Sequence, residues 1–113
     1  VLRPGAPLAI YDYVAAAPIA GGAPLANVFV RPQVLIRRAQ RAGLTVLASG
    51  RPPEVGPVPA PWLEATAAVE AEIVRRHRRD PWCRTELRER AAFTRLRRSG
   101  RIIPWLLLLR RDD

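Results

Sequence analysis

The sequence predicts an α/β fold on three observations. Three short runs of apolar residues, at residues 8–11, 44–49 and 101–111, have the length and composition of β-strands. The segments between them include three stretches with the apolar spacing of helices. Proline and glycine stand at the boundaries of these stretches, where helices begin and end. The predicted order is strand, helix, strand, two helices, strand, which suits one small domain of 113 residues with a single sheet layer.

The predicted first strand follows a tight turn. Arg3-Pro4-Gly5 is turn chemistry, because proline fixes φ and glycine tolerates positive φ. Residues 8–11 are nearly continuously apolar, which is typical of a strand covered on both faces, as in a parallel sheet. Residues 15–27 are rich in alanine, glycine and proline, so we expect a loop there.

A helix and a second strand complete the first half of the chain. Pro32 suits the first turn of a helix, which we expect over residues 32–42. Gly43 is a good left-handed terminator for that helix, and residues 44–49 follow as a strand. Residues 1–50 therefore predict a β-α-β unit with a right-handed crossover.

A proline-rich connector and two helices follow. Residues 50–61 carry five prolines and predict a stiff connector. We expect one helix over residues 61–79 and a second over residues 81–98, with Asp80 capping the second helix and Pro81 in its first position. In the first of these helices one stripe is formed by Trp62, Thr66, Val69 and Ile73, and Glu64, Glu70 and Glu72 lie off it.

The second helix and the last strand are less regular. Apolar residues fall on two sides of residues 81–98, so this helix is either buried on two faces or broken. Ser99-Gly100 ends it. Residues 101–111 form the third strand, in which we expect Pro104 to confine regular pairing to Trp105 onward.

The composition narrows the classes of function. All 19 basic residues are arginine and the formal net charge is +9, which suggests either contacts with phosphate or nucleic acid, or a compositional bias shared with alanine, proline and glycine. The arginines are spread along the chain, which favours the second interpretation. The one cysteine excludes an intramolecular disulfide and fits a reducing cytoplasm. The apolar run near the C-terminus is too short to span a membrane.

A few polar residues are candidates for chemistry from the residues alone. His77, the single histidine, could serve as a general base, although a histidine among arginines is more often solvated or packed. Cys83 has no base or partner motif beside it, and we expect a small buried hydrophobe. No second metal ligand stands near either residue, so the sequence supports no metal site. The arginines at 75, 76, 78 and 79 form the densest basic cluster, which is either a solvated face or a site for an acidic partner or an anionic substrate.

The order of elements and three motifs resemble the C-terminal half of a class I S-adenosylmethionine-dependent methyltransferase of the small-molecule type. "VLRPGAPLAIYDYV" is similar to the segment that leads into the fifth strand of that family. "VLIRRAQRAGLTVLAS" is similar to the next helix and the sixth strand, and "RSGRIIPWLLLLRRD" to the final strand. The resemblance covers nearly the whole chain and implies a Rossmann-like sheet whose last strand inserts antiparallel between the other two.

The resemblance also implies a partial domain. Residues 1–50 would be the β-α-β unit, residues 51–100 a connector and a two-helix insertion that walls the substrate pocket, and residues 101–113 the final strand. The chain departs from the family because it lacks the glycine-rich turn and the acidic residue that bind S-adenosylmethionine; Gly21-Gly22 opens no helix and is not expected to replace the turn. We therefore expect the cofactor to be bound mainly by residues outside this chain.

The implied neighbours and site residues follow from the same resemblance. The first strand would need pairing by an N-terminal half on another chain or by a second copy, because an open edge invites strand addition. Asp12, at the carboxyl end of the first strand, would orient or deprotonate a small-molecule acceptor; the alternative is that it caps the loop or pairs with an arginine. Tyr13, Trp62 and Trp82 would line the substrate pocket, Tyr11 would lie on the other face, and core packing is expected for Trp105.

Two other functions remain open at this stage. The chain could be a non-catalytic scaffold, a partner subunit of a split or decayed methyltransferase. An arginine-rich nucleic-acid-binding protein is disfavoured, because the aromatic residues sit mainly in apolar runs and not in a charged stripe.

Overall fold

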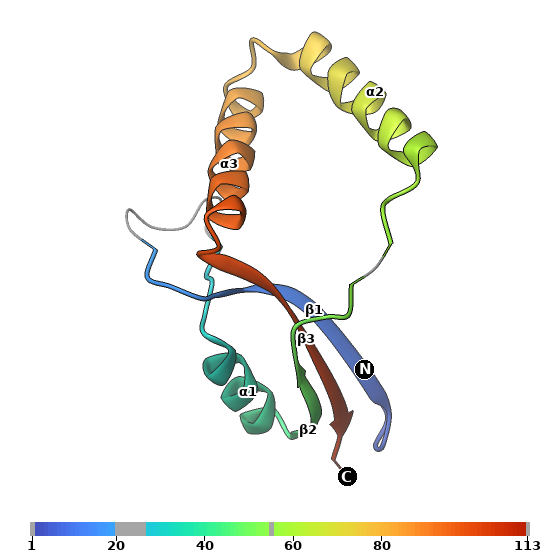
Figure 1. The fold of residues 1–113 in the computed structure, drawn as a ribbon, viewed down its shortest axis with the longest axis vertical. Coiled ribbons are helices and arrows are strands. Elements are labelled where there is room, and N and C mark those ends of the chain that lie inside the picture. Colours follow the sequence, from blue (N-terminus) through green and yellow to red (C-terminus); the bar gives the residue numbers. More distant parts are fainter. Residues whose placement is uncertain (1, 20–26, 55, 113) are drawn as a thin grey trace.

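A computed structural model describes residues 2–19, 27–54 and 56–112 of the chain (Figure 1). The described residues form an α/β structure with a three-stranded open sheet and three helices, in the order that the sequence predicts. The elements are β1 (Pro7–Ala15), α1 (Pro32–Arg41), β2 (Leu44–Gly50), α2 (Ala60–His77), α3 (Pro81–Arg98) and β3 (Ile102–Arg111).

The sheet has the order β1-β3-β2. β3 runs antiparallel to both neighbours, with Ile10 opposite Leu107 and Val46 opposite Leu109. β1 and β2 therefore run in the same direction, one on each side of β3. The expected antiparallel last strand is confirmed, although a sheet in which both pairs are antiparallel is not typical of a doubly wound fold. A bulge between Val46 and Ala48 shifts the register of β2.

Two sequence predictions about strands need correction. The first strand extends to Ala15, well beyond the apolar run, because β3 is long enough to pair with all nine of its residues. Pairing in β3 begins at Ile102, so the expectation that Pro104 would delay it to Trp105 is wrong. The physical reason is that β2 reaches only to Leu106 of β3, so one side of Pro104 has no ladder to interrupt.

α1 covers one face of the sheet. Ala39 on this helix is buried against Leu107 and Leu109 of β3, and neighbouring apolar side chains of α1, β1 and β2 pack around these three. Successive residues of a strand point to opposite faces, so Leu108 and Tyr11 lie on the other face. Leu108 and Tyr11 remain 40% and 58% exposed, because no described helix packs over them. The expectation that the first strand would be covered on both faces is therefore wrong.

α1 and α3 begin and end within one residue of the expected positions, whereas α2 begins one residue before and ends two residues before the expected range of 61–79. Proline occupies the first turn of each helix, and Gly43 and Gly100 follow α1 and α3 with φ of 76° and 72°, where a side chain would be strained. Asp80 stands at the N-cap of α3, but its carboxylate makes no capping hydrogen bond. α3 is continuous, so the alternative of a broken helix is wrong.

α2 and α3 extend away from the sheet, at the end opposite to the C-terminus (Figure 1). The Cα radius of gyration is 17.5 Å, compared with about 13 Å for a compact domain of 100 residues. None of the 18 residues of α2, all of which the structure describes, is buried. The described chain thus has a small core at the sheet and a helix pair that stands apart from it.

Candidate functional site

The carboxyl-terminal ends of β1 and β2 lie at the same end of the sheet, because both strands run antiparallel to β3. Ser49 and Gly50 end β2, while Asp12 and Tyr13 lie near the end of β1. Trp105 of β3 pairs with Asp12 in the strand register, and its indole Nε1 donates a hydrogen bond of 2.9 Å to Ser49 Oγ. An indole thus lies between two exposed polar side chains at the edge where α/β sheets bind ligands.

Asp12 also acts on the open edge of β1. Its Oδ1 accepts a 2.7 Å hydrogen bond from the Tyr13 backbone N–H. The Ala15 N–H donates to Val30 O and not to β3, and backbone groups alternate along an antiparallel strand, so the N–H groups of Tyr13, Tyr11 and Ala9 point away from β3. The Asp12 carboxylate therefore satisfies the one of these three donors that lies next to it.

Tyr13 lies on the opposite face of the sheet from Asp12 and on the same face as Tyr11, whose ring is edge-on to it with centroids 6.4 Å apart. The expectation that Tyr11 would lie on the other face from Tyr13 is therefore wrong. The Tyr13 ring packs edge-on against Phe93 of α3, with centroids 5.1 Å apart, and Phe93 also contacts the ring of Phe29 at 6.0 Å. The structure therefore gives Tyr13 a role in holding α3 to the sheet. No sequence pattern marks this cluster, because Phe29 lies in a loop and its contact with α3 is purely tertiary.

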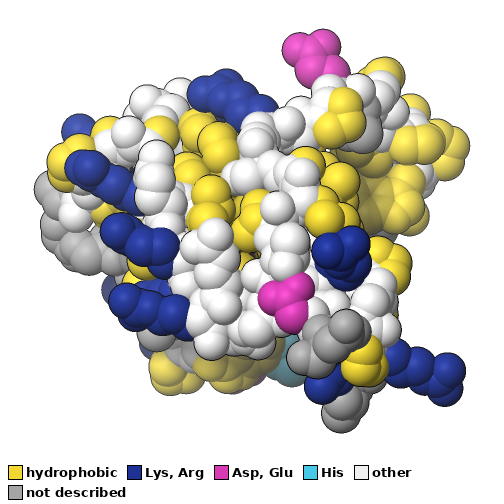
Figure 2. All heavy atoms as spheres, turned by 90° about the horizontal axis from the view of Figure 1, so that it is seen from below, with side chains coloured by type: hydrophobic (Ala, Val, Ile, Leu, Met, Phe, Trp, Pro, Cys, Tyr) yellow, Lys and Arg dark blue, Asp and Glu magenta, His cyan; other side chains and the backbone are white. Residues whose placement is uncertain are grey.

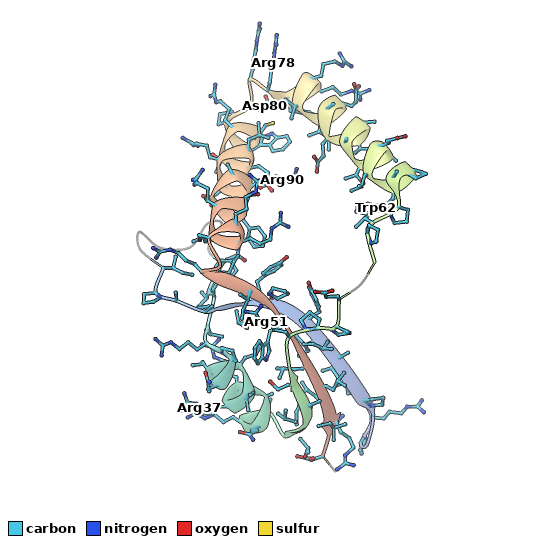
Figure 3. All side chains as sticks on the ribbon, viewed as in Figure 1. Arg37, Arg51, Trp62, Arg78, Asp80 and Arg90 are labelled. Atoms are coloured by element: carbon cyan, nitrogen blue, oxygen red, sulfur yellow. The ribbon has the colours of Figure 1, made fainter. Side chains whose placement is uncertain are left out.

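A groove between α2 and α3 forms a second candidate site, with a volume of about 940 Å³. Apolar side chains line much of it, including Cys83, which is 2% exposed as the sequence predicts. Arg90 Nη1 of α3 crosses to Glu70 Oε1 of α2 at 2.9 Å, and Glu86 lies 3.9 Å from Arg90 Nε. Figure 3 shows Arg90 on the side of α3 that faces α2.

His77 and Trp82 meet at the closed end of this groove, where α2 turns into α3. His77 Nδ1 lies 2.8 Å from Asp80 Oδ2, and the imidazole and indole centroids are 5.2 Å apart. The pairing explains why Asp80 does not cap α3: its carboxylate is turned back toward His77. Trp82 remains 55% exposed. The structure thus brings two of the sequence candidates, His77 and Trp82, into contact.

Trp62 is separated from that pair by the length of α2 (Figure 3). It is 59% exposed and does not line the groove. The candidates Asp12, Tyr13, Trp62 and the His77–Trp82 pair thus lie at four different places in the described chain. Ser49 and Trp105 join Asp12 without having been predicted, since a serine and a tryptophan in apolar strands have no distinctive pattern.

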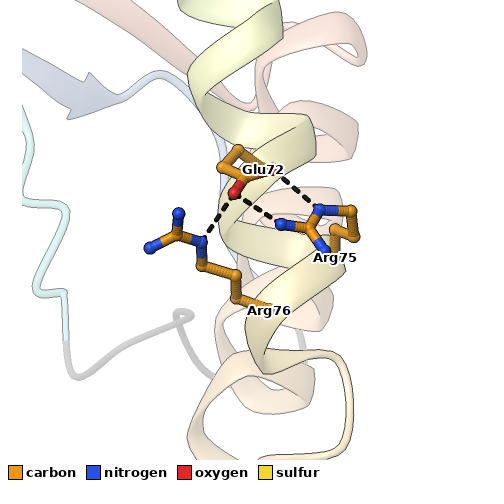
Figure 4. Close-up of polar contacts among 3 residues, drawn as sticks. All are labelled: Glu72, Arg75 and Arg76. Carbon is orange, nitrogen blue, oxygen red and sulfur yellow. Dashed lines mark hydrogen bonds and ion pairs between the residues drawn. The ribbon is translucent and has the colours of Figure 1, made fainter.

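The basic cluster at the end of α2 is organised by one carboxylate. Arg75 donates two hydrogen bonds to Glu72, of 2.8 and 2.7 Å, and Arg76 Nε donates a third of 2.6 Å (Figure 4). The bonds from Arg75 first, and then from Arg76, hold the pKa of Glu72 below its ordinary value, and Glu72 raises the pKa of Arg75. All three side chains are solvent-exposed, so this cluster orients guanidinium groups without burying charge.

The described residues contain no group of three or more histidine, cysteine, aspartate or glutamate residues placed to hold a metal ion. Gly21-Gly22 lies outside the described residues. No helix in the described ranges has the length and apolarity needed to cross a bilayer.

Seen from the sheet end, the surface has basic side chains around its rim with hydrophobic side chains between them (Figure 2).

Comparisons of this chain with family models, with curated proteins and with solved structures gave no match.

Proposed function

We propose that this chain supplies the acceptor-binding side of a class I S-adenosylmethionine-dependent methyltransferase that acts on a small molecule. One observation carries the proposal: the last strand lies antiparallel between two strands that run in the same direction. This is the arrangement that the sequence resemblance implies for the C-terminal end of that family. The Rossmann-like identity of the sheet is part of the proposal.

The unpaired outer edge of β1 supports the inference that a further strand pairs with it. The N–H groups of Ala9 and Tyr11 point outward, and in the described chain no strand pairs with that edge. We infer that a strand of the cofactor-binding half pairs there, from another polypeptide or from residues outside these 113. A second copy of the chain is the alternative occupant of the edge.

The residues of this chain can contribute acceptor binding and proton transfer. Methyl transfer needs the accepting atom to be aligned and, for an oxygen or nitrogen acceptor, relieved of a proton. Asp12 is the exposed carboxylate at the ligand-binding end of the sheet, and the Trp105 indole beside it offers an apolar surface. We assign proton acceptance to Asp12 and acceptor contact to Trp105. The chain lacks the turn and the acidic residue that would hold the cofactor, and we assign no step to cofactor binding here.

Calorimetry with S-adenosylmethionine tests the proposal. The 113-residue chain alone should show no micromolar binding, whereas the chain joined to or mixed with the polypeptide encoded immediately upstream should bind the cofactor. Micromolar binding by the chain alone would contradict the division into halves. Cofactor binding by the assembly with no methyl transfer to any of a panel of small-molecule phenols, amines and acids would instead assign the chain a scaffold role.

The single cysteine is compatible with assembly in the reducing cytoplasm, where we place the protein.

A matched pair of variants tests the edge itself. Tyr11→Pro removes an outward N–H without removing a bond to β3, so it should abolish assembly while leaving the isolated fold intact. Tyr11→Ala removes the ring but keeps the N–H, and it should still assemble. Equal assembly by both variants would exclude strand pairing at this edge.

A further inference from the structure

We propose that the outer face of α1 binds the phosphate backbone of a double-stranded nucleic acid. The outer face is defined as the exposed residues of α1, which are Gln33, Arg37, Arg38, Gln40 and Arg41. The proposal concerns a surface of this chain alone and is independent of the methyltransferase assignment.

The sequence of α1 gives the helix two opposite sides. Leu35, Ile36 and Ala39 pack toward the sheet, where Ala39 is buried against β3. At about 100° per residue, Arg37 and Arg41 fall on the opposite side, with the other exposed residues at its borders. Figure 3 shows Arg37 on the side of α1 that faces away from the sheet. The sheet therefore anchors the helix by one side while three guanidinium groups are presented to solvent on the other.

The arginines of the outer face have no acidic partner within the described chain. Among the described residues, none of these three makes an ion pair or a side-chain hydrogen bond. Arg75 and Arg76 of α2, by contrast, are both held by Glu72. Residues 13–53, which include α1, contain five arginines and no acidic residue. The outer face thus carries uncompensated positive charge, and an anionic partner is complementary to it.

The composition of the outer face distinguishes a phosphate backbone from other anionic partners. No residue of α1 is among the exposed large hydrophobic residues of the described chain. The centre of a protein interface is apolar and aromatic, and a membrane-binding helix buries an apolar side in the lipid, so neither partner fits a face of arginine and glutamine. Guanidinium groups donate paired hydrogen bonds to phosphate oxygens, and glutamine side chains also contact phosphate and sugar in complexes with nucleic acids.

The absence of aromatic residues favours a duplex over a single strand. Proteins bind single strands by stacking the bases on aromatic side chains, and α1 has none. The sequence argument against nucleic acid concerns such stacking, which phosphate contacts to a duplex do not require. Arg37 and Arg41 are one helical turn apart, about 6 Å along the axis, which is more than the rise of about 3.4 Å per phosphate on one strand. The two guanidinium groups can therefore bind different phosphates.

The salt dependence of binding tests the proposal on the whole chain. Fluorescence anisotropy measures binding to a labelled duplex of about 20 base pairs, as DNA and as RNA, between about 50 and 200 mM salt. Each phosphate contact contributes about 0.9 to the slope of log K against log salt, so the double variant Arg37→Gln and Arg41→Gln should lower that slope by about 1.8. The control, Arg75→Gln and Arg76→Gln, removes the same charge from arginines that Glu72 already engages, and its slope should stay within about 0.5 of wild type.

A third variant separates lost phosphate contacts from a damaged helix. Arg37→Lys and Arg41→Lys together keep the charge and should keep the wild-type slope. Equal slopes in the two glutamine variants would overturn the proposal, as would no binding to either duplex at about 50 mM salt and about 100 μM chain. Tighter binding to polyglutamate or to phosphatidylserine vesicles than to both duplexes would overturn the choice of partner. The duplex that binds more tightly, DNA or RNA, identifies the source of the phosphates.

Discussion

Single carboxylates have several distinct roles in this molecule. Asp12 binds the backbone of the next residue, Asp80 binds His77, and Glu72 holds two arginines. In each case a short side chain is committed to a neighbour one to four residues away. Sequence spacing alone allows these contacts but does not choose among them, which is why Asp80 was expected as a cap and is found paired with His77.

The Glu72 cluster has a predictable pH dependence. The pKa of the Glu72 carboxyl is lowered in the folded chain. The stability that Glu72 contributes to α2 is therefore fully present above the pKa of Glu72 in the unfolded chain, and it is lost as the pH falls through the lowered pKa. Helical ellipticity at 222 nm should therefore decline below about pH 4 more steeply than in Glu72→Gln. Identical acid titrations of the two proteins would show that the arginine contacts do not persist in solution.

The indole of Trp105 offers a second residue-scale test. Ser49→Ala removes the acceptor of its N–H, and we expect a loss of about 1 kcal/mol in the free energy of unfolding. Urea denaturation followed by tryptophan fluorescence measures it. Thr45→Ser, on the same strand, serves as the conservative control. A stability equal to wild type in Ser49→Ala would indicate that water replaces Ser49.

At the scale of elements, the positions of proline and glycine predicted helix boundaries better than the periodicity of apolar residues did. Pro32, Pro81, Gly43 and Gly100 set helix boundaries to within a residue, because they act through local backbone geometry. The limits of β1 and β3 were not predictable in the same way, because they depend on how far two distant strands run alongside each other. The stripe on α2 was correct in spacing, but spacing cannot say whether a stripe is covered.

The attachment of α3 depends on the aromatic cluster of Tyr13, Phe29 and Phe93. Phe93→Ala removes two ring contacts, and we expect the free energy of unfolding to fall by about 2–3 kcal/mol. Leu87→Ala, at a position of α3 that is 42% exposed and lines the α2/α3 groove, should cost less than about 1 kcal/mol. Denaturation curves for both variants measure the contrast, and equal losses would refute a special role for the cluster.

At the scale of the whole molecule, the sheet is open on one edge and one face. Hydrogen exchange of the isolated chain should be fast at the Ala9 and Tyr11 amides and slow at the Leu8 and Ile10 amides, which face β3. Amide-resolved NMR measures the alternation. Slow exchange at all four amides would mean that the β1 edge is already paired, for example by a second copy.

The candidate site could be predicted only in part, because contacts between residues that are distant in the sequence assemble the rest of it. Asp12 was predicted to lie at the carboxyl end of the first strand, but β1 continues to Ala15, so Asp12 lies three residues before that end. Trp105 lies opposite Asp12 in the strand register and donates a hydrogen bond to Ser49, and no local sequence pattern predicts either of these tertiary contacts. Tyr13 follows Asp12 directly in the chain and was predicted to line the acceptor pocket. Because successive residues of a strand point to opposite faces, its ring lies on the other face of the sheet and contacts Phe93.

The sheet and the helix pair are joined, in the described chain, by one aromatic cluster, by the short turn at residues 99–101 between α3 and β3, and by a proline-rich connector. Heating should therefore not melt them as one cooperative unit. Scanning calorimetry of the free chain should record a van 't Hoff enthalpy smaller than the calorimetric enthalpy, with the helices losing structure first. A bound partner that bridges both parts would merge the two transitions into one, so the sharpness of the melt would itself report assembly.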